Sequence, residues 1–243
     1  MQSNNIKLMK YITLPDDKTR RLSFYLAMEE YVARCICDTD CFFMWQVEPS
    51  VIFGRNQSLS SEVNMEYCRR KGINVYRRKS GGGCVYADKW NIMLSYVTSD
   101  DQVGVVFDRF MGMIMLVLRK LGIEAVSSAR NDVLINGKKV SGTAFYHLPH
   151  GSIVHSTLLY DTDMENMTNA ITPGTDKLQA KGIQSVRQRI TILKDYTTLN
   201  IEELKAFIRD TLCSDVQQLS ESDVAAIEQI EQTYLKEEFI HLL

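Results

Sequence analysis

The chain has 243 residues, of which 45% are hydrophobic and 24% are charged, a composition typical of a globular protein. Its 28 basic and 30 acidic side chains give a net charge of -2, so no overall positive field attracts nucleic acid or anionic membranes. The first ten residues lack the apolar core of a signal peptide, and the most apolar later stretch, residues 103–122, is interrupted by Asp108 and Arg109. We therefore expect a cytoplasmic protein.

Cysteine usage predicts free thiols. The spacing of the cysteines is irregular, and a chain of this length needs no disulfide to stabilise its core. Cys35, Cys37 and Cys41 lie close together, but no CxxC pair occurs and none of the four histidines is near enough in sequence to complete a metal site. We expect these three residues to pack at the end of a helix. The six cysteines are Cys35, Cys37, Cys41, Cys68, Cys84 and Cys213.

Apolar periodicity predicts one continuous α/β pattern without a linker, so we treat residues 1–243 as a single domain. Residues 103–121 have a helical period, and Gly122 stands where a C-terminal cap is expected. Residues 91–97 alternate as a strand does, but both faces are partly apolar, so we expect helices to cover the sheet. The other predicted elements are helices at residues 21–36, 201–212 and 223–235, the last capped by Ser220, and strands at 49–54, 73–78 and 152–161.

The segment DVLINGKKV, residues 132–140, is the clearest local signal in the sequence. Asn136 and Gly137 can both adopt the positive φ angles of a two-residue type I′ turn, and apolar residues lie on both sides. The sequence therefore predicts a β-hairpin with Lys138 and Lys139 directly after the turn.

The segment RRKSGGGCVYA, residues 77–87, predicts a loop that contacts an anionic ligand. Three consecutive glycines favour a sharp turn or a close approach of the backbone to a ligand. The cationic residues Arg77, Arg78 and Lys79 come directly before them. The spacing matches neither a P-loop nor GxGxxG, and the loop lies between two predicted strands. A glycine-rich hairpin with solvated arginines is the alternative interpretation.

A second constellation, RNDVLINGKKVSGTAF at residues 130–145, strengthens the case for an anion site. Small residues follow Lys139 and leave room for a ligand beside it. Cations that bind phosphates, together with Asp132 as a ligand for Mg²⁺, suit an acyl phosphate or a nucleotide. An exposed strand lysine is the alternative for Lys139.

These segments together resemble the catalytic domain of lipoate-protein ligases. RRKSGGGCVYAD, RNDVLINGKKVSGTAF, HSTLLYD and DKLQAKGIQSVRQRITIL carry the resemblance, and WQVEPSVIFGRNQ and LAMEEY fit the N-terminal part of that domain. The resemblance implies an α/β fold shared with biotin-protein ligase catalytic domains, with a mixed β-sheet packed against helices. It implies an enzyme that joins lipoic acid to ATP, releases pyrophosphate, holds lipoyl-AMP and transfers the lipoyl group to a lysine of a lipoyl domain.

The resemblance also assigns residues to the site. Lys139 falls on the catalytic lysine, which touches both the lipoyl carbonyl and the phosphate, and Asp132 remains the candidate ligand for Mg²⁺. The expected acceptors are apo lipoyl domains of 2-oxoacid dehydrogenases or the glycine cleavage H protein. The residues expected to bind ATP and lipoyl-AMP are Arg78, Ser80, Gly81, Gly82, Gly83, Cys84, Val85, Tyr86, Asn131, Ser141 and Gly142.

The sequence departs from the family pattern in several places. Tyr25, Ala87, Ser156 and Ile192 stand where the family commonly has asparagine, histidine, glycine and asparagine. Many of these ligases continue into an accessory C-terminal domain, which the 243 residues do not encode. We therefore expect that adenylation of lipoate is slow, or needs a separate accessory protein, whereas transfer from lipoyl-AMP is efficient.

Two other functions stay open at this point. Octanoyl and lipoyl transferases of the same fold use a catalytic cysteine and a carrier thioester. Lys181 stands at the cysteine position of one type, and residues 127–134, where another type has its cysteine, contain none. Cys84 is better interpreted as a small residue of the pocket wall. A non-catalytic binder of lipoate is the second alternative. The sequence does not decide between lipoate and octanoate.

Overall fold

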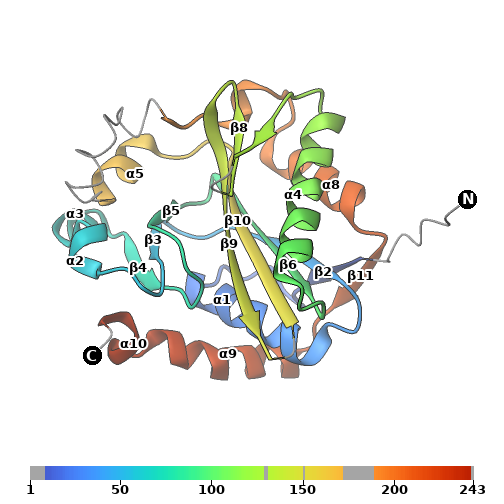
Figure 1. Ribbon diagram of the computed structural model, residues 1–243. Coiled ribbons are helices and arrows are strands. Elements are labelled where there is room, and N and C mark those ends of the chain that lie inside the picture. The colour runs from blue at the N-terminus through green and yellow to red at the C-terminus, as the bar shows by residue number, and fades with distance from the viewer. Residues whose placement is uncertain (1–8, 129–130, 150, 172–188, 242–243) are drawn as a thin grey trace, which may run out of the picture.

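The computed structural model describes residues 9–128, 131–149, 151–171 and 189–241. An eight-stranded mixed sheet forms the centre, and a separate three-stranded sheet lies beside it (Figure 1). The large sheet has the order β11-β1-β2-β6-β10-β9-β8-β7 and the small one β4-β3-β5. The strands are β1 Lys10–Thr13, β2 Cys41–Trp45, β3 Ser50–Phe53, β4 Asn74–Arg77, β5 Val85–Ala87, β6 Asn91–Thr98, β7 Val126–Ser127, β8 Asp132–Ile135, β9 Lys138–Leu148, β10 Gly151–Leu159 and β11 Asp215–Gln218.

Helices cover both faces of the large sheet, because the side chains of its central strands are apolar on both faces. On β6, Met93 and Val97 join one buried cluster, whereas Ile92 and Leu94 join the other. Helices α1 and α9 pack on the first cluster, and α4 and α8 pack on the second. The helices are α1 Leu22–Tyr31, α2 Leu59–Glu62, α3 Met65–Lys71, α4 Val103–Lys120, α5 Met164–Ala170, α8 Ile201–Leu212, α9 Glu221–Leu235 and α10 Glu237–His241.

The predicted helix at residues 21–36 is the element whose boundaries differ most from the structure. The α-helix ends at Tyr31, and a π-helical turn, Val32–Ile36, follows it. By contrast, Gly122 adopts φ +74° directly after the C-cap residue of α4, and Ser220 forms a capping box at the start of α9. Within the described residues, no helix is both long enough and apolar enough to cross a bilayer.

The predicted hairpin is confirmed. Asn136 and Gly137 adopt φ angles of 51° and 75°, and β8 pairs antiparallel with β9. Positive φ at both central residues is the geometry of a type I′ turn. The turn therefore places Lys139 opposite Leu134, whereas Asp132 at the other end of β8 pairs with Gly142.

The small sheet holds the glycine loop. Strand β3 pairs parallel with β4 and antiparallel with β5, so the loop that joins β4 to β5 must cross the end of β3. The chain leaves β3 through Gly54, where an added Cβ would overlap the carbonyl oxygen of Gly82. Gly54 thus allows the backbone of the glycine loop to pack directly against the end of β3.

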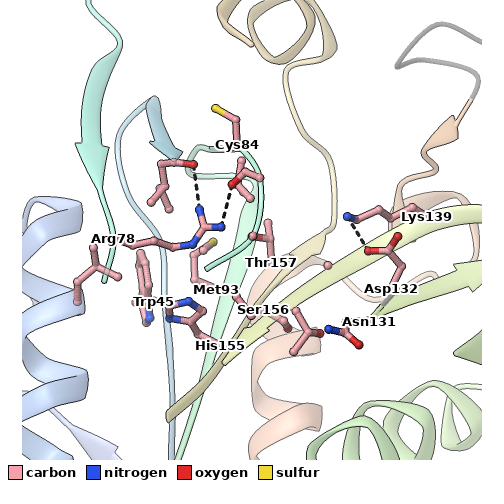
Figure 2. Close-up of a pocket in the computed structure, with 18 residues that line it drawn as sticks. Trp45, Arg78, Cys84, Met93, Asn131, Asp132, Lys139, His155, Ser156 and Thr157 are labelled. Carbon is pink, nitrogen blue, oxygen red and sulfur yellow. Dashed lines mark hydrogen bonds and ion pairs between the residues drawn. The ribbon is translucent and has the colours of Figure 1, made fainter. Parts of the chain in front are cut away.

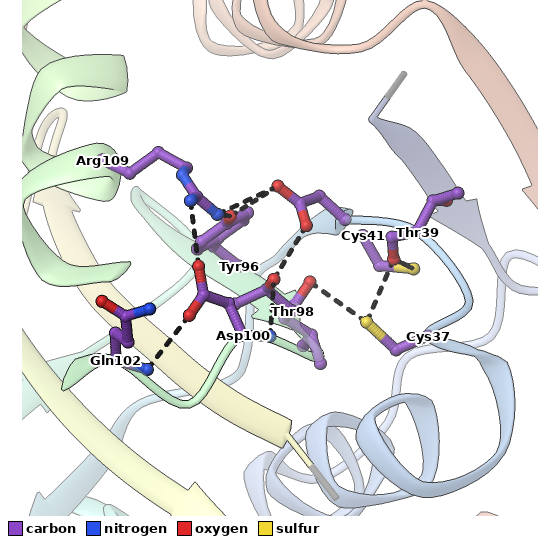
Figure 3. A network of polar contacts seen from close by, with 10 residues as sticks. Cys37, Thr39, Cys41, Tyr96, Thr98, Asp100, Gln102 and Arg109 are labelled. Atoms are coloured by element: carbon purple, nitrogen blue, oxygen red, sulfur yellow. Dashed lines mark hydrogen bonds and ion pairs between the residues drawn. The ribbon is translucent and has the colours of Figure 1, made fainter. Parts of the chain in front are cut away.

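A buried polar network joins the start of β2, the end of β6 and helix α4 (Figure 3). The carboxylate of Asp40, only 4% exposed, accepts hydrogen bonds from Tyr96 Oη at 2.7 Å and Thr98 Oγ1 at 2.8 Å. The guanidinium of Arg109 contacts the same carboxylate and donates to Asp100 at 3.0 Å. The network satisfies polar groups that would otherwise be buried without partners.

The three clustered cysteines belong to this same region and do not form a metal site. Cys37 and Cys41 both donate to the carbonyl oxygen of Thr39, and Cys35 is exposed. All six cysteines are free thiols, as the sequence predicts. Across the described residues, no group of three histidine, cysteine or acidic side chains is arranged to hold a metal ion.

We predict that Asp40→Ala destabilises the protein by about 2 kcal/mol, because the hydroxyls of Tyr96 and Thr98 lose their buried acceptor. Urea unfolding followed by circular dichroism measures this change. Asp100→Ala is the control, and its effect should be smaller because the Asp100 side chain is partly exposed. Equal losses for the two variants would contradict the assignment of Asp40 as the centre of the network.

Candidate functional site

A cavity of about 250 Å³ lies where the two sheets meet (Figure 2). The small sheet and its glycine loop form one wall. Strands β6, β9 and β10 and the hairpin end form the other. The cavity is lined by Leu26, Trp45, Ile52, Arg78, Gly82, Gly83, Cys84, Val85, Met93, Asn131, Asp132, Lys139, Gly142, Thr143, Ala144, His155, Ser156 and Thr157.

The side chain of Arg78 gives the glycine loop its shape. Its guanidinium donates to the carbonyl oxygens of Gly81 at 2.7 Å and Gly83 at 2.8 Å, and to Ile52 O at 3.2 Å. Nε also donates to Ser80 Oγ at 3.0 Å. Burial lowers the pKa of Arg78 to about 10, so the group stays charged at neutral pH. The loop is held around a buried positive charge whose hydrogen-bond partners in the described structure are neutral.

The other two cations of the segment 77–79 do not line the cavity, and Arg78 is also the one of the three that the sequence analysis assigned to the ligand. Arg77 donates to Arg55 O and Gln57 O, both at 2.8 Å, and to Ile240 O at 3.0 Å. Lys79 forms an ion pair with Glu30 at 2.6 Å. Arg77 and Lys79 therefore fasten neighbouring segments to the small sheet, and Arg78 alone of the three lines the cavity.

Lys139 and Asp132 lie at the opposite end of the cavity and form an ion pair of 2.7 Å. The side chain of Lys139 runs across Gly142, where an added Cβ would lie 2.5 Å from Nζ and 2.6 Å from Cε. Gly142 therefore leaves free the space that the end of the lysine side chain occupies. Asn131, beside them, adopts φ +67°, a conformation that asparagine tolerates better than most residues.

Apolar side chains and a series of buried hydrogen bonds form the end of the cavity near Arg78. Trp45 Nε1 donates to Ser95 Oγ at 2.9 Å, and Ser95 donates to Glu29 at 2.6 Å. Glu29 accepts from Nδ1 of His155 at 2.9 Å, and Nε2 of His155 lies 2.8 Å from Ser80 Oγ. Since Ser80 also accepts from Arg78, this series connects the apolar end to the glycine loop.

This second network was not expected from the sequence. Glu29 and His155 are 126 residues apart, and nothing in their local patterns indicates that they pair. Glu29 is 3% exposed, so its negative charge requires a buried partner. A glutamate on the buried face of the first helix is the only local signal that could have indicated such a network.

The structure places most of the predicted ligand-binding residues in the cavity wall, and four outside it. Ser80 is buried behind the wall, and Gly81 contributes its carbonyl to Arg78. Tyr86 turns away from the cavity into the cluster beneath the small sheet, and the hydroxyl of Ser141 is buried without a partner in the described structure. These four residues could act on a ligand only through the backbone or through their neighbours. Lys181 lies outside the described residues.

Cys84 lines the cavity but lacks the properties of a nucleophile. Burial raises the pKa of its thiol to about 12, and the nearby carboxylate of Glu62 adds to the shift. At neutral pH a thiol with this pKa is almost entirely protonated, and the thiolate is the reactive form. We therefore interpret Cys84 as a small residue of the cavity wall, as the sequence suggested.

Comparison with known proteins gives a consistent family. A family model described as the lipoyl protein ligase A/B catalytic domain matches residues 22–213. Lipoate–protein ligase 1 of Staphylococcus aureus is 34% identical over 213 residues, which cover 84% of this chain and 65% of that protein. A lipoate-protein ligase of Bacillus subtilis is 35% identical over 173 residues, covering 70% and 52%. The chain thus spans about half to two thirds of the length of these relatives.

Solved structures show the same fold at lower identity. A bi-partite lipoate protein ligase from Thermoplasma acidophilum superimposes with a TM-score of 0.83 at 24% identity, over 97% of this chain and 98% of that one. A lipoate-protein ligase A bound with ATP superimposes with a TM-score of 0.81 at 22% identity, over 98% and 99%. The mixed sheet packed with helices is therefore the fold of this group, as expected.

We predict that Gly142→Ala weakens ATP binding about tenfold or more, because the new methyl group displaces Lys139 from the cavity. Isothermal titration calorimetry with ATP measures the change. Gly112→Ala in α4 is the matched control, since no atom lies within 4 Å of the Cβ it adds, and its affinity should equal that of the unaltered protein. Equal affinities for all three proteins would show that Lys139 does not contact the nucleotide.

Proposed function

The chain belongs to the lipoyl protein ligase A/B catalytic-domain family, and from this premise we propose that it activates lipoate with ATP and transfers the lipoyl group to a lysine of a lipoyl domain. The observation that carries the proposal is that one cavity combines apolar and cationic side chains. Trp45 and Met93 supply an apolar surface that suits an acyl chain. Arg78 on the glycine loop and Lys139 at the other end of the cavity bring positive charge from two sides to the phosphates.

In the first step, an oxygen of the lipoate carboxylate attacks the α-phosphorus of ATP. The bond between that phosphorus and the pyrophosphate oxygen breaks, and pyrophosphate leaves with the electron pair. Two anions must approach each other, so a fixed cation at the point of attack lowers the barrier. Lys139 supplies this cation from β9, and the buried charge of Arg78 adds to the positive potential from the glycine loop.

We propose Asp132 as the residue that holds Mg²⁺ together with the phosphates of ATP. Mg²⁺ commonly takes one or two protein carboxylates and completes its shell with phosphate oxygens and water, so a single aspartate at the cavity fits this role. The metal would supply charge neutralisation for the phosphates. Asp132 pairs with Lys139 at 2.7 Å, and binding of the metal would free the lysine for the phosphate.

In the second step, the neutral amine of an acceptor lysine attacks the lipoyl carbonyl. An amide bond forms, the bond from the acyl carbon to the phosphate oxygen breaks, AMP leaves with the electron pair, and the amine loses a proton. Lys139 can stabilise the negative charge that develops on the carbonyl oxygen and on the departing phosphate. The expected acceptors are lipoyl domains of 2-oxoacid dehydrogenases or the glycine cleavage H protein.

We further propose that a separately encoded accessory protein assists adenylation. The superimposable Thermoplasma protein is described as bi-partite and is paired with an E2 lipoyl domain, which supports this arrangement. If the accessory protein closed over the cavity, it would exclude water from lipoyl-AMP, a mixed anhydride that water hydrolyses. The thioester transferase is the less favoured alternative. In the described structure Cys84 is the one cysteine in the cavity wall, and its raised pKa keeps the thiol protonated.

The purified chain, incubated with ATP, lipoate and an apo lipoyl domain, tests the function, and Lys139→Ala tests the site. We predict that Lys139→Ala lowers the rate of lipoyl-AMP formation by at least ~100-fold, the range for removal of one preorganised electrostatic contact. Lys138→Ala is the control, because that lysine is exposed on the neighbouring position. Activity of the Lys139 variant within a few-fold of the unaltered chain would reject the assignment.

The same assay separates the two half-reactions. Transfer from preformed lipoyl-AMP should be faster than its formation from ATP and lipoate in the isolated chain. Adenylation as fast as transfer, with no added protein, would reject the need for an accessory protein and leave the ligase activity in place.

We predict that no acyl-enzyme forms on Cys84, because its thiol is protonated well beyond neutral pH. Intact-protein mass spectrometry after incubation with an octanoyl carrier thioester should show no octanoyl adduct. Cys84→Ser should retain ligase activity within a few-fold. A stoichiometric adduct that Cys84→Ser abolishes would instead favour the transferase.

A further inference from the structure

Trp90 is an exposed aromatic residue outside the cavity, on the turn between β5 and β6. Its side chain is 43% exposed and does not line the cavity. The chain has two tryptophans, and the other, Trp45, is 3% exposed. Tryptophan is enriched among the residues that dominate protein–protein binding, so a tryptophan kept at the surface calls for a physical reason.

The backbone of this turn is held firmly. Asp88, itself 2% exposed, accepts the N–H of Trp90 at 2.9 Å and the N–H of Asp163 at 3.0 Å. The carbonyl oxygen of Trp90 accepts the N–H of Asp161 at 3.1 Å, and Gln46 donates to the carbonyl oxygen of Lys89. A rigid turn presents its aromatic side chain with little backbone entropy left to lose on binding.

The register of the large sheet places Trp90 at the same end of the central strands as Lys139. Ile92 on β6, Leu158 on β10 and Ser141 on β9 lie in one row across the three strands. Two strand spacings separate the outer members of this row by about 10 Å. Strands β6 and β9 run in the same direction, and Trp90 and Lys139 each precede their member of the row by two residues, with a β-bulge at Val140 between Lys139 and Ser141.

Backbone hydrogen bonds through residues 191–194 and 160–161 connect the two positions. The N–H of Thr191 donates to the carbonyl oxygen of Lys139 at 2.9 Å, and the N–H of Lys194 donates to that of Tyr160 at 3.1 Å. Asp161, the next residue, bonds to Trp90. Trp90 therefore lies on the rim of the catalytic end, with ordered backbone between it and Lys139.

We propose that Trp90 is a docking contact for the acceptor lipoyl domain during lipoyl transfer. This inference rests on the proposed function. The acceptor amine must reach the carbonyl beside Lys139, and a lysine side chain has only four methylenes between its backbone and its amine. The domain that carries the lysine must therefore rest against this rim, where Trp90 offers the exposed aromatic surface that such contacts use.

The test separates docking from adenylation. In transfer from preformed lipoyl-AMP to an apo E2 lipoyl domain, Trp90→Ala should raise the KM for the domain about tenfold or more, with lipoyl-AMP formation unchanged. Trp90→Phe should restore much of the affinity. Val216→Ala is the matched control, since Val216 is 58% exposed on the edge strand β11 and should leave the KM unchanged.

Acrylamide quenching gives an independent measurement, because Trp90 is the exposed tryptophan of the two. A saturating concentration of lipoyl domain should protect the fluorescence from quenching, and this protection should be lost in Trp90→Ala.

An unchanged KM and unchanged quenching would overturn the docking role while leaving the ligase function standing. Self-association that depends on Trp90, seen by sedimentation, would assign the surface to a second copy of the chain. A wild-type chain that transfers no lipoyl group would reject the proposed function itself, and this inference with it.

Discussion

The glycine loop depends on one buried guanidinium. Arg78 satisfies its donors with backbone carbonyls and a serine hydroxyl, so the loop must curl around the charge to provide them. A buried cation is stable only when its N–H groups are bonded, and this requirement fixes the positions of Gly81 and Gly83. These hydrogen-bond partners are neutral, so the guanidinium brings its charge to the cavity wall. The shape of the loop and the phosphate binding that we propose for it thus have the same origin.

The two ends of the cavity are built from different parts of the fold. The hairpin and β9 supply Lys139 and Asp132, whereas helix α1 and strands β2 and β10 supply Glu29, Trp45 and His155. Ser80 links the second of these regions to the glycine loop, since it contacts both His155 and Arg78. A change in the packing around the acyl chain can therefore reach the phosphate-binding loop through hydrogen bonds alone.

The sequence predicted those features that depend on neighbouring residues. The Asn136-Gly137 turn, the capped helix α9 and the strand β6 follow from local backbone preference and periodicity. It could not predict the separate three-stranded sheet, because strand register is set by contacts between distant segments. For the same reason it gave no role to Arg77 and Lys79, whose partners Ile240 and Glu30 are distant in the sequence. The pairing of Glu29 with His155 likewise depends on the completed fold.

The contact of Gly54 with Gly82 joins two backbones and involves no side chain. Its strength therefore does not depend on the side chains of Met93 or Ile52, so variants at these two positions can reshape the apolar end of the cavity without changing this contact. Trp45 differs from them, because its indole N–H begins the series of hydrogen bonds that reaches Ser80. An engineer who seeks a different acyl substrate can therefore vary Met93 and Ile52 while Gly54 and Gly82 keep the loop in place.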